Sequence, residues 1–351
     1  MNPLEALHLS LPLIQAPMAG VSTPDMAAAV SNAGALGSIA VGAVEAPAAR
    51  EMIASVRART ARPFNVNLFV HSPAQARPDV EARWLTALKP LFAQFGGAPP
   101  ATLREIYRSF AVDDAMLGLV VEARPAVVSF HFGLPEAWRI ATLKAAGCIL
   151  FASVTSLAEA LAARAAGIDM LVAQGFEAGG HRGVFDPDAP DDRLGAMALT
   201  RLLVEQAGLP VIAAGGIMDG RGVRAALDLG AVAAQLGTAF IGCPESSADA
   251  AYRAALFGPA AAHTAMTRAI SGRPARCLPN RFVGWGAETD LTPPDYPIAY
   301  DAGKALHQLA KAHGESGYGA QWAGQGAPLA RALPAAELVD RIRTEMDEGE
   351  Y

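Results

Sequence analysis

The chain has 351 residues, of which 52% are hydrophobic and 18% are charged, and its formal net charge is −6. This length and composition predict a folded protein with a large buried core. The basic residues are scattered, so nucleic acid is excluded as an expected partner. Residues 1–17 lack a basic leader, and no window is long and apolar enough to cross a membrane, so we expect a cytoplasmic protein without a membrane partner.

Short apolar runs recur along the first 240 residues, and each is followed by an alanine-rich segment with helical spacing. Near-continuous apolar strands that alternate with helices are typical of parallel strands buried on both faces. The pattern predicts an α/β protein built as a closed (β/α)8 TIM barrel, and an open doubly wound sheet is the alternative. The eight runs span residues 13–18, 36–42, 64–70, 126–133, 148–154, 170–175, 210–216 and 231–240.

Two segments exceed this repeat. Residues 71–124 contain several prolines and helical pieces, which indicate an insertion between the third and fourth strands. Residues 241–351 continue after the eighth strand with helical segments and a stretch rich in glycine and proline. We therefore expect a barrel over residues 1–240 and a C-terminal helical region, 241–351, which forms a cap over the barrel mouth together with the insertion. The active site of a TIM barrel lies at that mouth.

Small residues end the seventh and eighth strands, at Gly215 and Gly216 and at Gly237 and Thr238. In barrels that bind phosphorylated ligands, the loops after these two strands supply backbone N–H groups to the phosphate. The same glycines could serve only as tight strand-to-helix turns. Because both pairs stand at the two expected strand ends, we favour phosphate binding.

The stretch QGFEAGGHRG, residues 174–183, follows the sixth strand. Its glycines can adopt positive φ or lie flat against a planar ligand, and they would project His181 into the pocket. An isolated histidine is often structural, but a histidine on a glycine-flanked loop at the barrel mouth favours a functional role.

Other polar residues lie at strand ends or on a predicted helix. The amides of Asn67 and Gln174 offer both a donor and an acceptor, which suits the pyrimidine edge of a flavin, or they could bridge neighbouring strands. In DYPIAYDAGKAL, Tyr300 and Lys304 are four residues apart on one helical face, just after Tyr296. From spacing alone, a solvated surface lysine is the simpler interpretation of that helix.

The sequence holds no metal-binding pattern. Cys148, Cys243 and Cys277 are the only cysteines and lie far apart, which also excludes a disulfide framework. The histidines are dispersed, and neither HExxH nor GxSxG occurs, so we expect neither zinc nor hydrolytic triad chemistry.

These stretches resemble the nitronate monooxygenase family, formerly called 2-nitropropane dioxygenases, over nearly the whole chain. The similar motifs are LIQAPMAGVSTPDMAAAVSNAGALG, FNVNLF, FHFGLP, QGFEAGGHRGVF, LPVIAAGGIMDGRGVRAALDLGA, QLGTAF, YPIAYDAGKAL and QWAGQG. FHFGLP and the last two motifs are similar to the class that acts without reduced nicotinamide.

The resemblance implies a non-covalently bound FMN in a (β/α)8 barrel, with His181 as the catalytic residue. It implies a substrate pocket formed by His131, Tyr296, Tyr300 and Lys304, with Tyr107 and Tyr252 in less closely matching surroundings. The FMN contacts that it implies are Met18, Asn67, Gln174, Gly179, Gly216, Gln235, Leu236, Gly237 and Thr238.

The implied reaction is the oxidation of alkyl nitronates, with propionate 3-nitronate as the expected substrate, by O2 to a carbonyl compound plus nitrite or nitrate. In the family this proceeds through a flavin semiquinone and serves detoxification. His181 would donate a hydrogen bond to the nitro group, or would abstract the α-proton of a neutral nitroalkane.

Two alternatives remain open at this stage. FMN-dependent NAD(P)H reductases of the same superfamily, which reduce enoyl-ACP or quinones, carry a similar histidine loop. A barrel that binds FMN without catalysis is the other alternative. The expected oligomeric state is a monomer or a homodimer.

Overall fold

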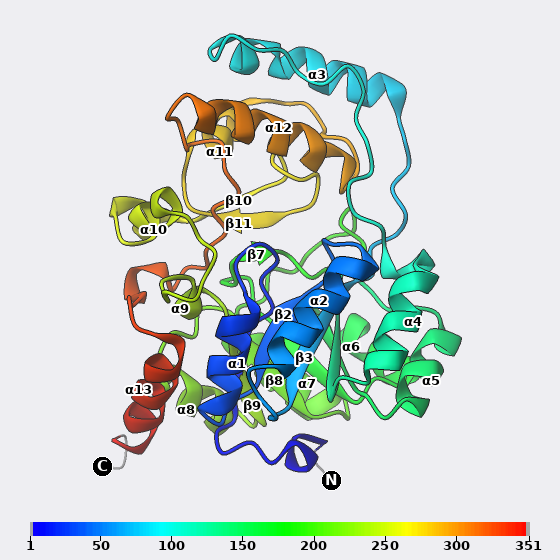
Figure 1. Cartoon of the computed structure of the whole chain (residues 1–351), viewed down its shortest axis with the longest axis vertical. Coiled ribbons are helices and arrows are strands. Elements are labelled where there is room, and N and C mark those ends of the chain that lie inside the picture. Colours follow the sequence, from blue (N-terminus) through cyan, green and yellow to red (C-terminus); the bar gives the residue numbers. More distant parts are fainter. Residues whose placement is uncertain (1–2, 349–351) are drawn as a thin grey trace.

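The computed structural model describes residues 3–348, and its centre is an eight-stranded parallel sheet in the order β1-β9-β8-β6-β5-β4-β3-β2. The sheet closes on itself, because the amide of Gln15 donates to the carbonyl of Leu36 and the amide of Leu36 donates to the carbonyl of Leu13, both at 2.9 Å. The structure is therefore the predicted (β/α)8 barrel and not an open sheet (Figure 1). Every barrel strand lies within one of the eight predicted runs: β1 (Leu13–Gln15), β2 (Gly37–Ala40), β3 (Phe64–Phe69), β4 (Val127–His131), β5 (Ile149–Val154), β6 (Met170–Gln174), β8 (Val211–Ala214) and β9 (Ala233–Leu236).

Helices surround the barrel, and local sequence sets many of their ends. The hydroxyl of Thr23 accepts from the amide of Met26 at 3.1 Å and caps α1, whose first residue is Pro24. Gly167, with φ +88°, ends α6 in the left-handed conformation. The ring helices between consecutive strands are α1 (Pro24–Asn32), α2 (Ala46–Arg57), α4 (Asp114–Ala123), α5 (Ala137–Ala145), α6 (Leu157–Ala166), α7 (Ala196–Gln206) and α8 (Gly220–Asp228).

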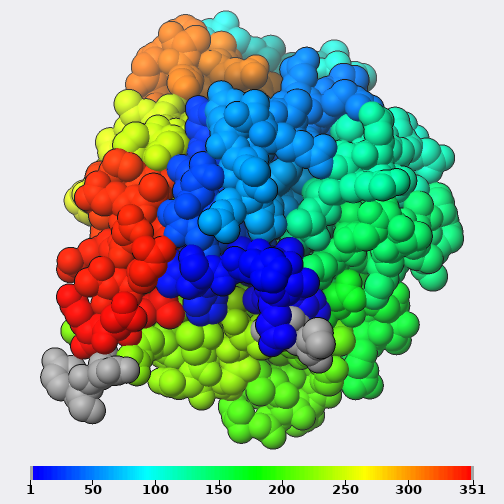
Figure 2. Space-filling model, turned by 60° about the horizontal axis from the view of Figure 1, so that its bottom comes forward, coloured from blue at the N-terminus to red at the C-terminus, as the bar shows by residue number. Residues whose placement is uncertain are grey.

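Two ring helices come from segments that we expected to lie outside the repeat. Helix α4 belongs to residues 71–124 but packs against α2 and α5 in the ring. Helix α13 (Ala335–Asp347) packs against α8 and α1, and Figure 2 shows its segment beside the N-terminal segment. The helix after the last strand, α9 (Thr238–Ile241), has a single turn. The chain therefore returns from the cap to complete the ring with α13.

The opposite end of the barrel is covered by the N-terminal 3-10 helix η1 (Pro3–Leu7). Leu4 and Leu7 pack in one apolar cluster with Ile14, Leu36 and Phe151 from the barrel interior. Figure 2 shows this segment lying across that end of the molecule. Water is thus kept from the barrel interior on the side away from the mouth.

A cap covers the ends where the strands terminate (Figure 1). Helix α3 from the insertion packs on α12, and Trp84, Leu88, Phe282 and Leu306 share one apolar cluster. A small antiparallel sheet, β10-β11-β7, joins this layer to the loop after β6.

Among the described residues, no helix is long and apolar enough to span a membrane. The 3-10 helix η2 (Phe110–Val112) packs against α4 on the barrel wall. The cap elements are α3 (Pro78–Ala93), β7 (Gly180–His181), α10 (Ala250–Leu256), η3 (Pro259–His263), β10 (Ala265–Thr267), β11 (Ala275–Cys277), α11 (Arg281–Glu288), α12 (Ile298–Ala312) and η4 (Ala327–Leu329).

Candidate active site

A cavity of about 740 Å³ lies between the barrel mouth and the cap. Its volume falls within the range of small-molecule pockets, about 300 to 1,000 Å³. Asn67, Ser129 and Gln174 line it from the strands, whereas Tyr300 and Lys304 line it from α12. The cavity is thus located where active sites lie in this fold.

The backbone of His181 is held in place from two sides. Its carbonyl accepts from Nε2 of Gln174 at 3.0 Å and from Nε2 of His131 at 3.2 Å. The Oε1 atom of Gln174 accepts from the amide of Gly183 at 2.6 Å. In strand β7, His181 pairs with Ala275 of β11. The histidine is therefore fixed to both the barrel and the cap.

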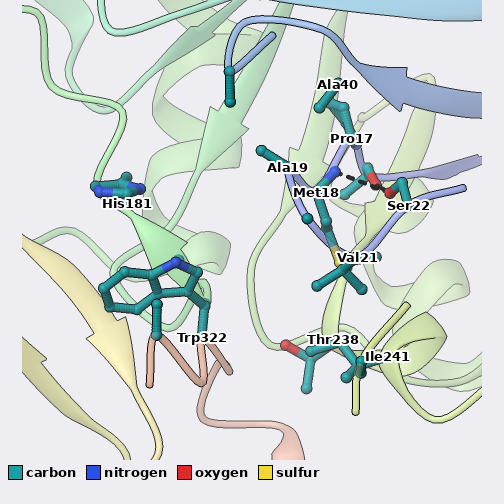
Figure 3. Close-up of a pocket in the computed structure, with 18 of the residues that line it drawn as sticks. Pro17, Met18, Ala19, Val21, Ser22, Ala40, His181, Thr238, Ile241 and Trp322 are labelled. Carbon is teal, nitrogen blue, oxygen red and sulfur yellow. Dashed lines mark hydrogen bonds between the residues drawn. The ribbon is translucent and has the colours of Figure 1, made fainter. Parts of the chain in front are cut away.

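The ring of His181 is surrounded mainly by aromatic side chains. Its centroid lies 5.1 Å from that of Trp322, 5.3 Å from that of Tyr296 and 5.5 Å from that of Phe132. Figure 3 shows His181 next to Trp322 and facing Met18 and Thr238 across the pocket. Burial, together with the positive groups nearby, holds the pKa of His181 well below its ordinary value. The imidazole is therefore neutral near pH 7.

Phe132 occupies the centre of this aromatic group in an unusual conformation. Its φ is +77°, in the left-handed region that a bulky residue rarely adopts. The conformation places its ring between His181, His131 and the guanidinium of Arg273, whose central carbon lies 4.4 Å from the ring centroid. A strained residue that organises a site is typical of functional regions.

Two cations contribute to the site, Arg273 near the histidine and Lys304 on the cavity wall. Arg273 is buried, it donates to the carbonyl of Val184, and burial lowers its pKa to about 10. It forms no salt bridge with any acidic residue in the range 3–348. The ammonium of Lys304 lies 4.8 Å from the ring centroid of Tyr107 and 5.4 Å from that of Tyr300, and it is exposed to the open cavity. The site is thus positively charged and suited to an anion.

The predicted pocket residues all line this one cavity. The hydroxyl of Tyr296 is buried, and no group among the described residues bonds to it. Tyr252 instead donates its hydroxyl to the backbone carbonyl of Trp322 and so anchors the backbone at that residue. Burial raises the pKa values of both tyrosines well above 10, so both are neutral. The lining set contains His131, His181, Tyr107, Tyr252, Tyr296, Tyr300 and Lys304.

The predicted cofactor residues line the same cavity, with one exception. Gly215 and Gly216 have φ values of +115° and +72°, which only glycine adopts readily, and they form the turn after β8. The amide of Met18 donates to the hydroxyl of Ser22 at 3.0 Å (Figure 3). Leu236 does not line the cavity, because its side chain is in the core. Its carbonyl accepts from the amide of Ala16. The lining set contains Met18, Asn67, Gln174, Gly179, Gly216, Gln235, Gly237 and Thr238.

The QWAGQG segment, residues 321–326, contacts two of these lining residues, Gly179 and Thr238. A β-carbon at Gly179 would lie 2.4 Å from the amide nitrogen of Gly324, so only glycine allows this crossing of chains. The hydroxyl of Thr238 accepts from the same amide at 2.9 Å. The segment therefore locks the histidine loop against the end of the last barrel strand.

Sequence reasoning missed Ser271, Arg273 and Trp322 as site residues. The hydroxyl of Ser271 lies 2.8 Å from Nε2 of His181. Residues 271 and 273 belong to a connection that the sequence marks only by glycine and proline. Trp322 lies in the QWAGQG motif, but the sequence did not connect that motif with the site. No group of residues within 3–348 could hold a metal ion.

The barrel and its capped, positively charged cavity define an enzyme of the TIM-barrel class with its site at the carboxyl ends of the strands. A model of the nitronate monooxygenase family matches residues 2–345. A nitronate monooxygenase of Paraburkholderia phytofirmans is 60% identical over 347 residues, which cover 99% of this chain and 95% of the relative. A nitronate monooxygenase of Pseudomonas aeruginosa is 57% identical over 343 residues, which cover 97% of each chain.

Solved structures agree with this relationship. A nitroalkane oxidase from Streptomyces ansochromogenes has a TM-score of 0.89 and 38% identity, with 99% of this chain and 98% of that chain covered. FabK from Thermotoga maritima has a TM-score of 0.75 and 28% identity, with 98% and 95% covered. The chain belongs to the nitronate monooxygenase family, as its motifs predicted, and it is an oxidoreductase. The family depends on a flavin.

Proposed function

We propose that this enzyme uses FMN and O2 to oxidise alkyl nitronates to a carbonyl compound plus nitrite or nitrate. The observation that carries the proposal is a neutral histidine, His181, beside the unpaired cation Arg273 and the cavity-facing Lys304. A nitronate is an anion that needs hydrogen-bond donors and positive charge around its oxygens. We further propose propionate 3-nitronate as the substrate and detoxification in the cytoplasm as the role.

The cavity fits a flavin mononucleotide. The glycine turn at Gly215 and Gly216 lines the cavity, at the loops after the last two barrel strands that bind phosphate in this fold. The buried amide of Asn67 donates to Ser129 at 2.9 Å and lines the same cavity. We infer that these residues, with Met18 and Thr238, hold the cofactor. Bound there, the flavin supplies the electron acceptor for the substrate and the redox partner of O2.

The protein side chains orient and stabilise the substrate. We infer that His181 contacts the nitro oxygens, because it lines the cavity with the ring of Tyr296 packed beside it. Lys304 attracts the negative charge, and its head group is held over two tyrosine rings. The aromatic walls exclude water and thereby strengthen these interactions. Residues 241–351, which contribute Tyr296 and Lys304, form the proposed substrate region.

The deciding experiment compares a nitronate with a nicotinamide as the electron donor. The purified protein should show a flavin spectrum, and FMN should be released on denaturation. Under anaerobic conditions, propionate 3-nitronate or ethyl nitronate should change the flavin absorbance, whereas NADH should not. In air, the nitronate should consume O2 and produce nitrite or nitrate. Bleaching by NADH without a response to either nitronate would instead make the enzyme a reductase.

A further inference from the structure

The side chain of Ser271 makes the polar contact with the ring of His181. Ser271 is fully buried in the connection between β10 and β11, and its Oγ lies 2.8 Å from Nε2 of the histidine. We propose that Ser271 is a positioning residue that keeps Nδ1 of His181 directed at the substrate and lets that nitrogen act as either a donor or an acceptor. The inference deepens the proposed function and rests on it for the identity of the substrate.

The position of Ser271 is built into the fold. The amide of Gly272 donates to the carbonyl of Arg268 at 2.8 Å, and Nε of Arg268 donates back to the carbonyl of Gly272 at 3.1 Å. Gly272 has φ +93°, and a β-carbon there would lie 2.5 Å from the carbonyl oxygen of Pro294. On the other side of Ser271, β11 pairs Ala275 with His181. The backbone of Ser271 therefore cannot move away from the imidazole without breaking the turn or the strand pair.

The other ring nitrogen of His181 is left for the ligand. No hydrogen bond joins Nδ1 to any group in residues 3–348, and this atom is not among the buried atoms that lack a partner. His181 also lines the cavity. The flanking rings of Phe132, Tyr296 and Trp322 limit rotation of the imidazole. Nδ1 is therefore the nitrogen that meets a substrate.

The hydroxyl of Ser271 has a second acceptor, the carbonyl of Arg273, at 3.3 Å. If the hydroxyl proton points to this carbonyl, Oγ accepts from an Nε2–H group, and Nδ1 carries a free lone pair. If the hydroxyl proton points to Nε2, the histidine proton lies on Nδ1, which then donates to an anion. The two arrangements differ by a rotation of the hydroxyl and by the tautomer of the imidazole, which gives up the proton on Nε2 and takes one on Nδ1 by exchange with water. The imidazole keeps its partner in both cases.

The arrangement with a proton on Nδ1 suits an anionic nitronate, and the arrangement with bare Nδ1 suits a neutral nitroalkane. A nitronate already carries the negative charge and takes a hydrogen bond from Nδ1–H. A neutral nitroalkane gives its α-proton to bare Nδ1: the C–H bond breaks, its electron pair stays on the nitroalkane as the nitronate, and His181 becomes an imidazolium. The new cation donates from Nε2–H to Ser271, whose own proton points to the carbonyl of Arg273. No other oxidant, reductant or base is needed for this proton transfer.

The test follows the protons of His181 by nitrogen NMR on flavin-loaded protein labelled with ¹⁵N-histidine. The His181→Asn variant assigns the signals, and nitrate, a planar anion with oxygens like those of a nitronate, is the probe. In the wild type we expect Nε2–H without nitrate and a shift of the proton to Nδ1 with nitrate. In Ser271→Ala that shift should be lost. A wild type without the shift, or an equal shift in Ser271→Ala, overturns the proposal.

Turnover separates this role from general damage. Ser271→Ala should lower kcat/KM for a nitronate about tenfold, the value of one hydrogen bond, while flavin content stays unchanged. Ser271→Thr, which keeps the hydroxyl, should recover most of the loss. Ser31→Ala removes another buried serine hydroxyl, far from the cavity on α1, and should leave both the NMR response and the turnover unchanged. If the wild type shows the NMR response but oxidises no nitronate, the proposed nitronate oxidation is overturned, whereas the positioning of His181 by Ser271 is still supported.

Discussion

The Nε2 atom of His131 lies 3.2 Å from the carbonyl oxygen of His181, so one histidine of the cavity holds the backbone of the other. A carbonyl can only accept, and Nε2 of His131 therefore carries the proton. Burial lowers the pKa of His131 to about 4, so this donor is a neutral imidazole at neutral pH. The sequence marked both histidines as site residues, but it did not reveal that one positions the other.

Replacing His131 should weaken catalysis through the position of His181. His131→Phe removes the donor, and the loss of one hydrogen bond predicts a fall in kcat of about tenfold. His131→Gln restores an N–H group and should keep most of the activity. Steady-state kinetics with ethyl nitronate, with flavin content as the control, measure both. Equal losses in the two variants would show that the hydrogen bond does not matter.

Lys304 should act on substrate affinity. Lys304→Met should raise KM for a nitronate by up to about fivefold, the range of an exposed charge interaction, with a smaller effect on kcat. Lys304→Arg keeps the charge and should change KM less. Salt screens exposed charges, so the difference between wild type and Lys304→Met should shrink as ionic strength rises. Lys89→Met removes an exposed lysine of α3 and is the matched control. A KM difference that does not respond to salt would argue against an electrostatic role.

Two glycine-to-alanine changes should have opposite effects on stability. Gly179→Ala places a β-carbon 2.4 Å from the amide nitrogen of Gly324 and should cost about 1–3 kcal/mol with loss of flavin. Gly118→Ala adds a methyl group to an exposed position of α4 with nothing within 4 Å. It should stabilise the protein by about 0.5–1 kcal/mol. Urea unfolding measures both, and a neutral Gly179→Ala would mean that the two chains can separate at no cost.

His71 should make the folded protein sensitive to mild acid. Burial and the charge of Arg273 lower its pKa to about 4, whereas an unfolded chain has an ordinary histidine pKa of about 6.5. Below about 6.5 the unfolded chain binds the proton more readily, so stability falls as the pH falls from 6.5 toward 4. At pH 5 the loss is about 2 kcal/mol from this group.

Urea unfolding at pH 7.5 and pH 5 gives this loss as a difference within each variant. His71→Asn should reduce the difference by about 2 kcal/mol, whatever its effect at pH 7.5. His263→Asn, at an exposed histidine, should leave the difference unchanged. The same pH sensitivity in wild type and His71→Asn would place the acid-sensitive group elsewhere.

The sequence by itself determined the eight barrel strands, the family and the main lining residues, because each rests on a local signal. Buried parallel strands are continuous apolar runs, and His181, Tyr300 and Lys304 lie within recognisable motifs. Leu236 shows the limit of this reasoning. It belongs to a cofactor motif, yet the alternation of side chains in β9 turns it into the core.

Only the tertiary structure decided which distant segments meet. Ser271 lies 90 positions from His181 in the sequence and contacts it because β11 pairs with β7. Helix α13 completes the ring beside α1, although the cap separates it from the last barrel strand. Such contacts depend on the free energy of packing the whole chain, and a single sequence carries no local signal for them. The hydrogen-bond partner of His181, Ser271, is therefore defined only by the way the cap packs on the barrel.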